Sequence, residues 1–389
     1  MKELFEPGSI FPKILPDLSK SFGSNLYDIN EEKHFLDLFA NFSSLPLGFN
    51  PPCLQTNNFR EEVEPYLYQR TSLCAYDNPL TQRFHKALTQ LTDIRGYSGI
   101  TLAETGALAV EQALKLALLT LGPDTLILTV TRSYHGIYGL SSLLTAASSS
   151  ASERLPFVTN DQYTIKACET AQDILNEFYS QKKVIIIVEP LLCTSGDLAL
   201  PRDIVEIIGK LQSDPGVFLI SDEIQTGLFS TAMSWGYQLH NFNPDIIVFG
   251  KKTQVCGMLV KADSKTLIGA SNPKYFSSTF DASPIDIIRA IHIFDYIMSV
   301  KNSLQERLRS YTGLLSTAHN YLPHVIRTNS VGSLHALEFD TMENRNLVYK
   351  KLYDNNILSN PTGPCTIRFR FSLEPKQEDV DKLLSVLYS

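Results

Sequence analysis

Two short apolar runs decide the fold: V-F-L-I-S-D-E at Val217–Glu223 and I-I-V-F-G-K-K at Ile246–Lys252. Their apolar parts, Val217–Ile220 and Ile246–Phe249, are β-branched or aromatic and end in polar residues, which predicts two fully buried strands. Ligands bind beyond the carboxyl ends of the strands in a parallel sheet. We therefore expect a carboxylate and a lysine to meet in one crevice.

A lysine and a carboxylate in one crevice have a chemical use. Pyridoxal phosphate needs a lysine for its Schiff base and an acidic partner for its pyridinium nitrogen. Lys251 and Asp222 could supply both. The alternative is a pair of surface salt bridges at the strand ends, and the two strands alone favour it because fold does not imply function. The rest of the chain shifts the balance toward the cofactor.

The composition is that of an ordinary globular protein. At 389 residues the chain is long enough for two domains. Its hydrophobic content of 43% and charged content of 19% are typical, and its net charge of −7 argues against a nucleic-acid surface. The six cysteines lack C-x-x-C spacing, which favours reduced thiols in a cytoplasmic compartment. We expect no signal peptide, no membrane span and no metal site.

Strand-like and helix-like segments alternate between Gly99 and Val260. This alternation predicts a doubly wound α/β domain with a mainly parallel sheet. The further strands expected here are Ile100–Ala103, Thr125–Val130 and Lys182–Pro190, and the expected helices follow Thr105-Gly106-Ala107 and span Leu200–Leu211.

Outside this region the pattern indicates a smaller α+β domain. We expect residues 1–50 to be its N-terminal segment, residues 51–290 the large cofactor-binding α/β domain, and residues 291–389 its C-terminal part. Residues 1–30 are expected to be loop-like, and Glu32–Pro52 to form a short strand pair feeding a loop. The other expected elements are helices within Asn58–Leu91 and at Pro284–Leu308, Asn344–Asp354 and Gln377–Leu387, a surface loop at Thr145–Glu153, and strands at Leu334–Phe339 and Thr366–Phe371.

Two smaller features could bind a phosphorylated ring. Thr105-Gly106-Ala107 precedes an Ala- and Leu-rich helix, and the unpaired N–H groups at a helix N-terminus attract phosphate. Tyr134-His135 follows a predicted strand, where an aromatic side chain could stack on a flat ring. Alone, each has an ordinary explanation: a βα turn that binds nothing, and a packed tyrosine beside a satisfied histidine.

Several longer runs occur in the order of one known family and cover nearly the whole chain. They are L-D-L-F and L-G-F-N-P-P within Leu36–Pro52, E-T-G-A-L-A-V-E-Q-A-L-K at Glu104–Lys115, F-G-K-K-T-Q-V-C-G at Phe249–Gly257, S-S-T-F at Ser277–Phe280 and T-I-R-F-R-F at Thr366–Phe371. In these runs the chain resembles the class III (ω-) aminotransferases, pyridoxal-phosphate enzymes of fold type I, and most of all L-lysine 6-aminotransferases. The resemblance implies a large doubly wound domain plus a small domain built from both ends of the chain.

The resemblance also implies a role for each matched residue. Lys251 would form the Schiff base and shuttle the substrate proton, and Asp222 would partner the pyridinium nitrogen. Arg368 would bind a substrate carboxylate. Thr279 would bind the phosphate of the partner subunit's cofactor, which implies a homodimer with shared sites. The other implied cofactor contacts are Thr105, Gly106 and Ala107 at the phosphate, Tyr134 with His135 at the ring, Gln225 at the phenolic oxygen, and Glu189 and Ser278.

Departures from the family pattern fall at substrate positions. The family's arginine after His-Gly is Ile137, and an aliphatic side chain cannot replace a guanidinium that holds a carboxylate. The family's gating glutamate falls on Thr194, and both prolines of R-F-x-P-P-L are missing after Arg368. The family's G-G-N is Asp281-Ala282-Ser283. Cofactor residues are therefore kept while substrate residues are changed.

The leading hypothesis is a pyridoxal-phosphate-dependent aminotransferase that moves a terminal amino group to an oxo acceptor in a ping-pong cycle. Ile137 favours an amine without an α-carboxylate at that position, or one bound differently. Two alternatives stay open. One is a single-substrate aminomutase or racemase, which the loss of the glutamate at Thr194 would suit. The other is a non-catalytic homologue that binds the cofactor, although Lys251, Asp222 and Gln225 are all present.

Overall fold

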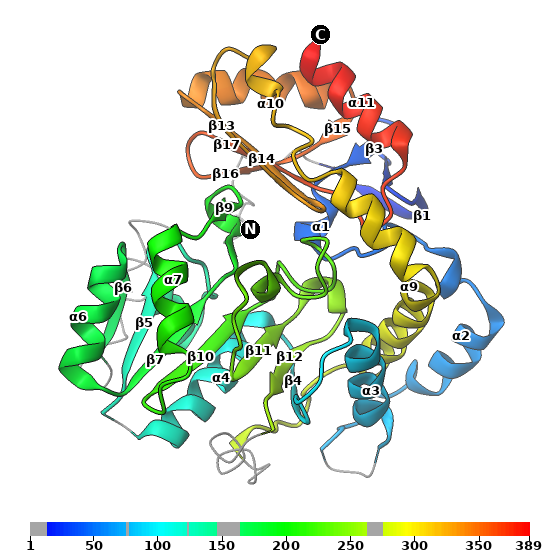
Figure 1. Ribbon diagram of the computed structural model, residues 1–389. Helices are drawn as coiled ribbons and strands as arrows, with labels where there is room; N and C mark the ends of the chain where they lie inside the picture. The colour runs from blue at the N-terminus through cyan, green and yellow to red at the C-terminus, as the bar shows by residue number, and fades with distance from the viewer. Residues whose placement is uncertain (1–13, 75–77, 123, 146–163, 263–274) are drawn as a thin grey trace, which may run out of the picture.

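The computed structural model describes residues 14–74, 78–122, 124–145, 164–262 and 275–389. Across these residues the central sheet has the order β4-β12-β11-β10-β7-β5-β6 (Figure 1). Neighbouring strands are parallel except at β12, which is antiparallel to both β11 and β4. The predicted mainly parallel sheet is confirmed. Its strands are β4 (Gly99–Ala103), β5 (Leu126–Val130), β6 (Ile165–Cys168), β7 (Val184–Val188), β10 (Val217–Asp222), β11 (Ile246–Phe249) and β12 (Cys256–Val260).

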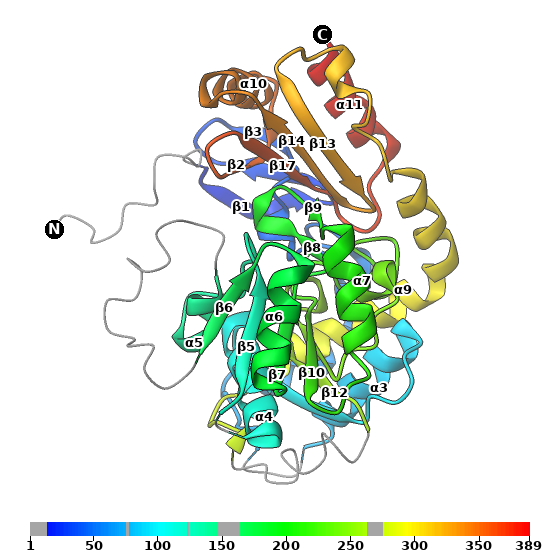
Figure 2. The ribbon, with the colours of Figure 1, turned by 60° about the vertical axis from the view of Figure 1, so that its left-hand side comes forward.

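Helices cover both faces of this sheet. They include α4 (Gly106–Leu121), α5 (Gly139–Leu144), α6 (Ala171–Gln181) and α7 (Arg202–Leu211). Successive residues of a strand point to opposite faces. Accordingly, Ile185 and Ile187 of β7 pack in the layer of α4, whereas Val184 and Ile186 pack in the layer of α6 and α7. Helices α6 and α7 lie side by side over the sheet in both views (Figures 1 and 2). The doubly wound arrangement is therefore confirmed.

A separate group of helices packs beside β4 and β12. It consists of α2 (Asn57–Val63), α3 (Leu80–Thr92) and α9 (Pro284–Ser310). Phe84 of α3 joins them to the sheet, because its ring lies 5.8 Å from that of Phe249 and 5.6 Å from that of Phe294 between ring centroids. Helix α9 begins at Pro284, whose fixed φ suits the first helical turn. It extends from the large sheet toward the upper part of the molecule (Figure 1).

The upper part of the molecule in Figure 1 is a smaller α+β unit. One of its sheets has the order β13-β14-β17-β16 and packs against α10 and α11. The other, β1-β2-β3-β15, joins the two ends of the chain, because β15 pairs in parallel with β3. The elements are β1 (Pro16–Phe22), β2 (Asn25–Asp28), β3 (Lys33–Asp37), β13 (Val325–Val331), β14 (Leu334–Phe339), α10 (Met342–Asp354), β15 (Ile357–Leu358), β16 (Asn360–Thr362), β17 (Thr366–Arg370) and α11 (Gln377–Tyr388).

The N-terminal region differs from the sequence-based expectation. The prediction of a loop across residues 1–30 is wrong where the structure describes them, because β1 and β2 form an antiparallel hairpin. Most side chains of β1 are exposed, so no buried apolar pattern marks it in the sequence. The expected loop at Thr145–Glu153 lies outside the described residues except for Thr145. The domain boundaries at residues 50 and 290 stay a prediction. In the described ranges, no helix combines the length and apolarity needed to cross a membrane.

Candidate active site

Lys251 and Asp222 lie at the same edge of the central sheet. Asp222 is the last residue of β10, and Lys251 follows β11 after Gly250 and opens the short 3₁₀ helix η5 (Lys251–Thr253). Parallel pairing places Asp222 opposite Val248 of β11, so both strands end together. The Lys251 Nζ donates a hydrogen bond to Gln225 Oε1 at 3.0 Å. Two of the predicted site residues, Lys251 and Gln225, are thus in direct contact beside the end of the strand that carries Asp222.

Asp222 is buried and held by a histidine. Its Oδ2 lies 2.8 Å from His135 Nδ1, and its Oδ1 accepts from the Ile224 N–H at 3.2 Å. The other ring nitrogen of His135, Nε2, lies 2.9 Å from Thr129 Oγ1. The histidine therefore fixes the orientation of the carboxylate, a contact that its predicted position beside Tyr134 did not reveal.

Glu189 supports the backbone of Tyr134. It directly follows β7 and accepts the Tyr134 N–H on Oε1 at 2.8 Å. Burial, with the nearby charge of Asp222, raises the pKa of Glu189 to about 8. Glu189 thus accepts a hydrogen bond from the backbone of Tyr134, the predicted stacking residue, and its pKa responds to the charge of Asp222, the predicted pyridinium partner.

The N-terminus of α4 lies against the end of β10. Thr105 caps this helix, because its Oγ1 accepts the Leu108 N–H at 3.3 Å. A Cβ at Gly106 would lie 2.7 Å from Ile224 Cδ1, and a Cβ at Gly136 would lie 2.7 Å from Ala107 Cβ. Gly136 also has a φ of +133°, which only glycine adopts readily. These glycines let the helix N-terminus approach the strand ends closely.

These residues fit pyridoxal phosphate. Within the described residues no carboxylate forms an ion pair with Lys251, and burial together with the charge of Arg368 lowers its pKa to about 8. A half-buried amine with a lowered pKa is suited to bond with a carbonyl carbon. The fixed carboxylate of Asp222 suits a pyridinium, and the α4 N-terminus suits a phosphate. An amine, a carboxylate and a helix N-terminus are therefore present for the aldehyde, the ring nitrogen and the phosphate of that cofactor.

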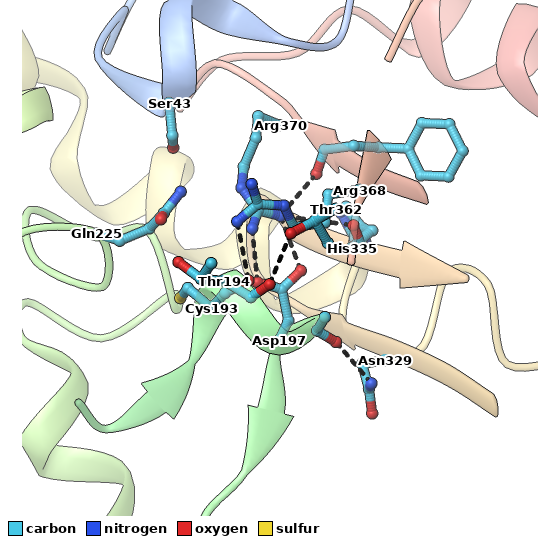
Figure 3. Close-up of polar contacts among 12 residues, drawn as sticks. Ser43, Cys193, Thr194, Asp197, Gln225, Asn329, His335, Thr362, Arg368 and Arg370 are labelled. Carbon is cyan, nitrogen blue, oxygen red and sulfur yellow. Dashed lines mark hydrogen bonds and ion pairs between the residues drawn. The ribbon is translucent and has the colours of Figure 1, made fainter. Parts of the chain in front are cut away.

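The small α+β unit contributes Arg368 to the same region. Arg368 lies on β17, is buried, and donates from Nη1 to the Cys193 carbonyl at 2.9 Å (Figure 3). Burial, and next the charge of Arg370, lower the pKa of Arg368 to about 10. Thr194 lies in the short turn η3 (Cys193–Ser195), and its carbonyl accepts from Thr362 Oγ1 at 2.7 Å. Thr194, which the resemblance places at the gating position, is thus a neutral residue bonded to the small unit.

A cavity of about 560 Å³ lies between residues of the large domain and residues of the small unit. Tyr134 and Thr194 line it on one side, and Glu338, Thr362 and Cys365 line it on the other. Ile137 is 50% exposed and does not line this cavity within the described residues. The predicted substrate positions 137 and 194 therefore do not share this space.

In the described residues, neither Ser278 nor Thr279 has a hydrogen bond to Lys251. Both are exposed, and Asp281 Oδ1 accepts from the backbone N–H and the hydroxyl of Ser278. Ser278 borders a cavity of about 720 Å³ along α4. Their predicted cofactor contacts stay predictions.

Two buried residues of the site region were missed from the sequence. Arg370 on β17 forms a bidentate ion pair with Asp197, with Nη1–Oδ2 and Nη2–Oδ1 distances of 2.7 Å each (Figure 3). Asp197 lies in the hairpin of β8 (Leu191–Leu192) and β9 (Leu198–Ala199). The sequence did contain one indication of Arg370: it lies two residues after Arg368 on a predicted strand, which places both arginines on the same face.

The chain matches one family model and named relatives over nearly all of its length. The model of the class-III aminotransferases matches residues 11–389. An L-lysine-epsilon aminotransferase of Streptomyces clavuligerus is 28% identical over 414 residues, covering 96% of this chain and 89% of that protein. An acetylornithine aminotransferase of Nostoc sp. is 28% identical over 394 residues, covering 95% and 88%.

The fold matches solved structures of related enzymes. The lysine aminotransferase from M. tuberculosis in the internal aldimine form superposes with a TM-score of 0.88 at 24% identity, covering 97% of this chain and 95% of that one. An ornithine aminotransferase from Toxoplasma gondii gives a TM-score of 0.80 at 22% identity, covering 98% and 91%. This chain belongs to the class-III aminotransferases, enzymes that depend on pyridoxal phosphate.

Proposed function

We propose that this aminotransferase moves the amino group of a primary, terminal amine to an oxo acid, with Lys251 and Asp222 as its catalytic residues. The observation that carries the proposal is the half-buried amine of Lys251, free of any ion pair in the described residues, at the same sheet edge as the fixed carboxylate of Asp222. The names of its relatives, which refer to the ε-amino group of lysine and to acetylornithine, support a terminal amine.

The protein side of the mechanism follows from these positions. Pyridoxal phosphate, when bound, accepts the electron pair left on the substrate carbon after its proton is removed. Asp222, oriented by His135, would hold a proton on the ring nitrogen of the cofactor. Lys251 would anchor the cofactor and then, once free, move the proton at the substrate carbon, since its lowered pKa suits a base near neutral pH.

Other residues would position the cofactor. The N–H groups at the start of α4, with Thr105, Gly106 and Ala107, would bind its phosphate. Tyr134 would cover its ring, with its backbone held by Glu189. Gln225, already bonded to Lys251, would lie beside its phenolic oxygen. Ser278 and Thr279 would contact cofactor across a homodimer interface, which their exposure on the single chain supports.

The substrate side combines one kept residue with two changed ones. Arg368 would bind the carboxylate of the oxo acid, because a buried guanidinium favours a bidentate anion. Ile137 provides no cation, so the donor would lack an α-carboxylate at that position or bind it elsewhere. Thr194 offers no charge at the gating position. We also propose a cytoplasmic location, which the six free cysteines support.

The test is an absorbance titration of the purified protein with pyridoxal phosphate, followed by a panel of amines that includes L-lysine. We expect a near-visible band from the bound cofactor that bleaches with a terminal amine and returns with a 2-oxo acid. A band that never bleaches, or turnover that needs no 2-oxo acid, would favour a racemase or aminomutase instead. A protein that forms no band would contradict the cofactor assignment of Lys251.

A further inference from the structure

Four cationic side chains gather where β17 meets η5. They are Lys251, which is half-buried, and Lys252, Arg368 and Arg370, which are buried. The charge of Arg370 acts on the pKa of the other three. Lys252 donates to Ser43 Oγ, a neutral acceptor, at 2.5 Å. Among the described residues, Asp197 is the carboxylate that forms an ion pair with this group, and it pairs with Arg370. The cluster therefore keeps an excess of positive charge inside the protein.

Stability alone does not explain the Arg370–Asp197 pair. Both side chains are completely buried, and their desolvation offsets much of the attraction between them. Apolar replacements of such pairs are often neutral or stabilising. The pair fixes the orientation of the Asp197 carboxylate, because two nitrogens of one planar guanidinium hold both of its oxygens.

Arg368 is left without a carboxylate of its own. Its Nη1 donates to the Cys193 carbonyl, and its Nη2 to the Asn360 amide oxygen at 2.9 Å when that amide is turned toward it. Its Nε is buried and has no hydrogen-bond partner in the described residues. Neutral acceptors thus hold the guanidinium in place, and no carboxylate of the described residues is hydrogen-bonded to it.

Asp197 is close enough to compete for Arg368. Arg368 and Arg370 are two residues apart on β17, so both point at the segment from Cys193 to Asp197 (Figure 3). The charge of Asp197 already acts on Arg368, where it opposes the lowering of the pKa by burial. In the part of the chain that the structure describes, the bidentate bond to Arg370 engages both oxygens of this carboxylate.

We propose that Arg370 is a positioning residue that sequesters Asp197, so that Arg368 remains free to bind the carboxylate of the oxo-acid substrate. This inference rests on the proposed function, in which Arg368 is that receptor. It assigns Arg370 no contact with substrate or cofactor. It also explains the buried ion pair, since an Asp197 side chain that Arg370 did not hold could bond to Arg368 in place of a substrate carboxylate.

The test is the affinity of the cofactor-loaded enzyme for succinate, an unreactive dicarboxylate, measured by calorimetry, with the KM for a 2-oxo acid beside it. In Arg370→Met, Asp197 is released toward Arg368. We expect succinate binding to weaken and KM to rise by about tenfold or more, with little change in kcat. Adding Asp197→Asn to Arg370→Met removes the competing charge, and affinity should return to within about threefold of wild type.

Rescue by the second substitution separates sequestration from mere structural support. If the double variant binds succinate no better than Arg370→Met, the inference is wrong, and it is equally wrong if wild type does not bind succinate. Arg370→Lys provides a milder case: an ammonium holds one oxygen less rigidly, so an intermediate loss is expected. Arg202→Met, which breaks an exposed pair with Glu206, is the matched control and should change nothing. Bleaching of the cofactor band by an amine tests the proposed function independently.

Discussion

Lys251 is the residue whose chemistry depends most directly on its surroundings. Its lowered pKa of about 8 means that the amine is mostly protonated below pH 8, and only the neutral form can attack a carbonyl carbon. The cofactor-free protein should therefore capture pyridoxal phosphate about tenfold faster per pH unit up to about pH 8 and then level off. Stopped-flow absorbance measures this rate. A rate that does not vary between pH 6.5 and 9.5 would contradict the environment described for Lys251.

Replacement of Lys251 tests the same residue by turnover. Lys251→Ala should lose at least about a thousandfold in kcat, because no other side chain replaces the base, while its circular dichroism spectrum stays that of wild type. Full activity in this variant would end the assignment.

Glu189 makes the free energy of unfolding depend on pH. Its pKa rises from an ordinary 4.5 to about 8 in the folded state, so between these values the folded protein keeps a proton that the unfolded chain releases. Its contribution to the free energy of unfolding therefore falls as pH rises through this window. Glu189→Gln cannot ionise, and the variant should lose less stability than wild type between pH 5 and pH 7. Urea midpoints of the two cofactor-free proteins measure the difference, and parallel pH profiles would contradict it.

Individual site residues differ in how far the sequence predicts them. Lys251 and Asp222 each follow an apolar run that marks a strand end, so local pattern and chemistry together identify them. The contact of His135 with Asp222 joins residues 87 apart, and the pair of Arg370 with Asp197 joins residues 173 apart. Such contacts depend on the packing of whole units, and a single sequence without homologues contains no local sign of them.

At the scale of elements, the approach of α4 to the strand ends can be tested through Gly136. A methyl group there would meet Ala107 in the predicted phosphate site and would also strain a φ of +133°. Gly136→Ala should therefore weaken binding of pyridoxal phosphate by about tenfold or more. Gly363→Ala is the matched control, because Gly363 also has a positive φ, +51°, but has no atom within 4 Å of the added carbon. Equal effects of both substitutions on cofactor affinity, followed by absorbance, would show that crowding of α4 is not the cause.

Strands that are buried on both faces were predicted most accurately from the sequence. The apolar runs of β7, β10 and β11 coincide closely with observed strands, because a strand covered by helices must be apolar throughout. The hairpin of β1 and β2 was missed, since β1 is mostly exposed and gains its stability from neighbours. Helices α9, α10 and α11 start within two residues of the predicted positions.

At the scale of the whole molecule, shared sites can be tested by mixing subunits. One chain carries Lys251→Ala and the other Thr279→Ala, so each alone should have little activity. If two subunits share each site, a mixed dimer contains one site with both native residues. Random mixing makes about half of the dimers mixed, so activity should recover to about a quarter of wild type. No recovery after unfolding and refolding together, with mixed dimers confirmed by mass spectrometry, would show that Thr279 serves its own chain.

The parallel pairing of β15 with β3 has a consequence for how the protein is made. Leu36 pairs with Ile357, so one edge of β3 lacks its partner until the ribosome has reached β15. At roughly 5–20 residues per second, that wait lasts on the order of tens of seconds. The nascent chain thus carries an open strand edge until β15 is made, and a chaperone or another nascent chain could pair with that edge. A premature stop before Ile357 would leave that edge open permanently.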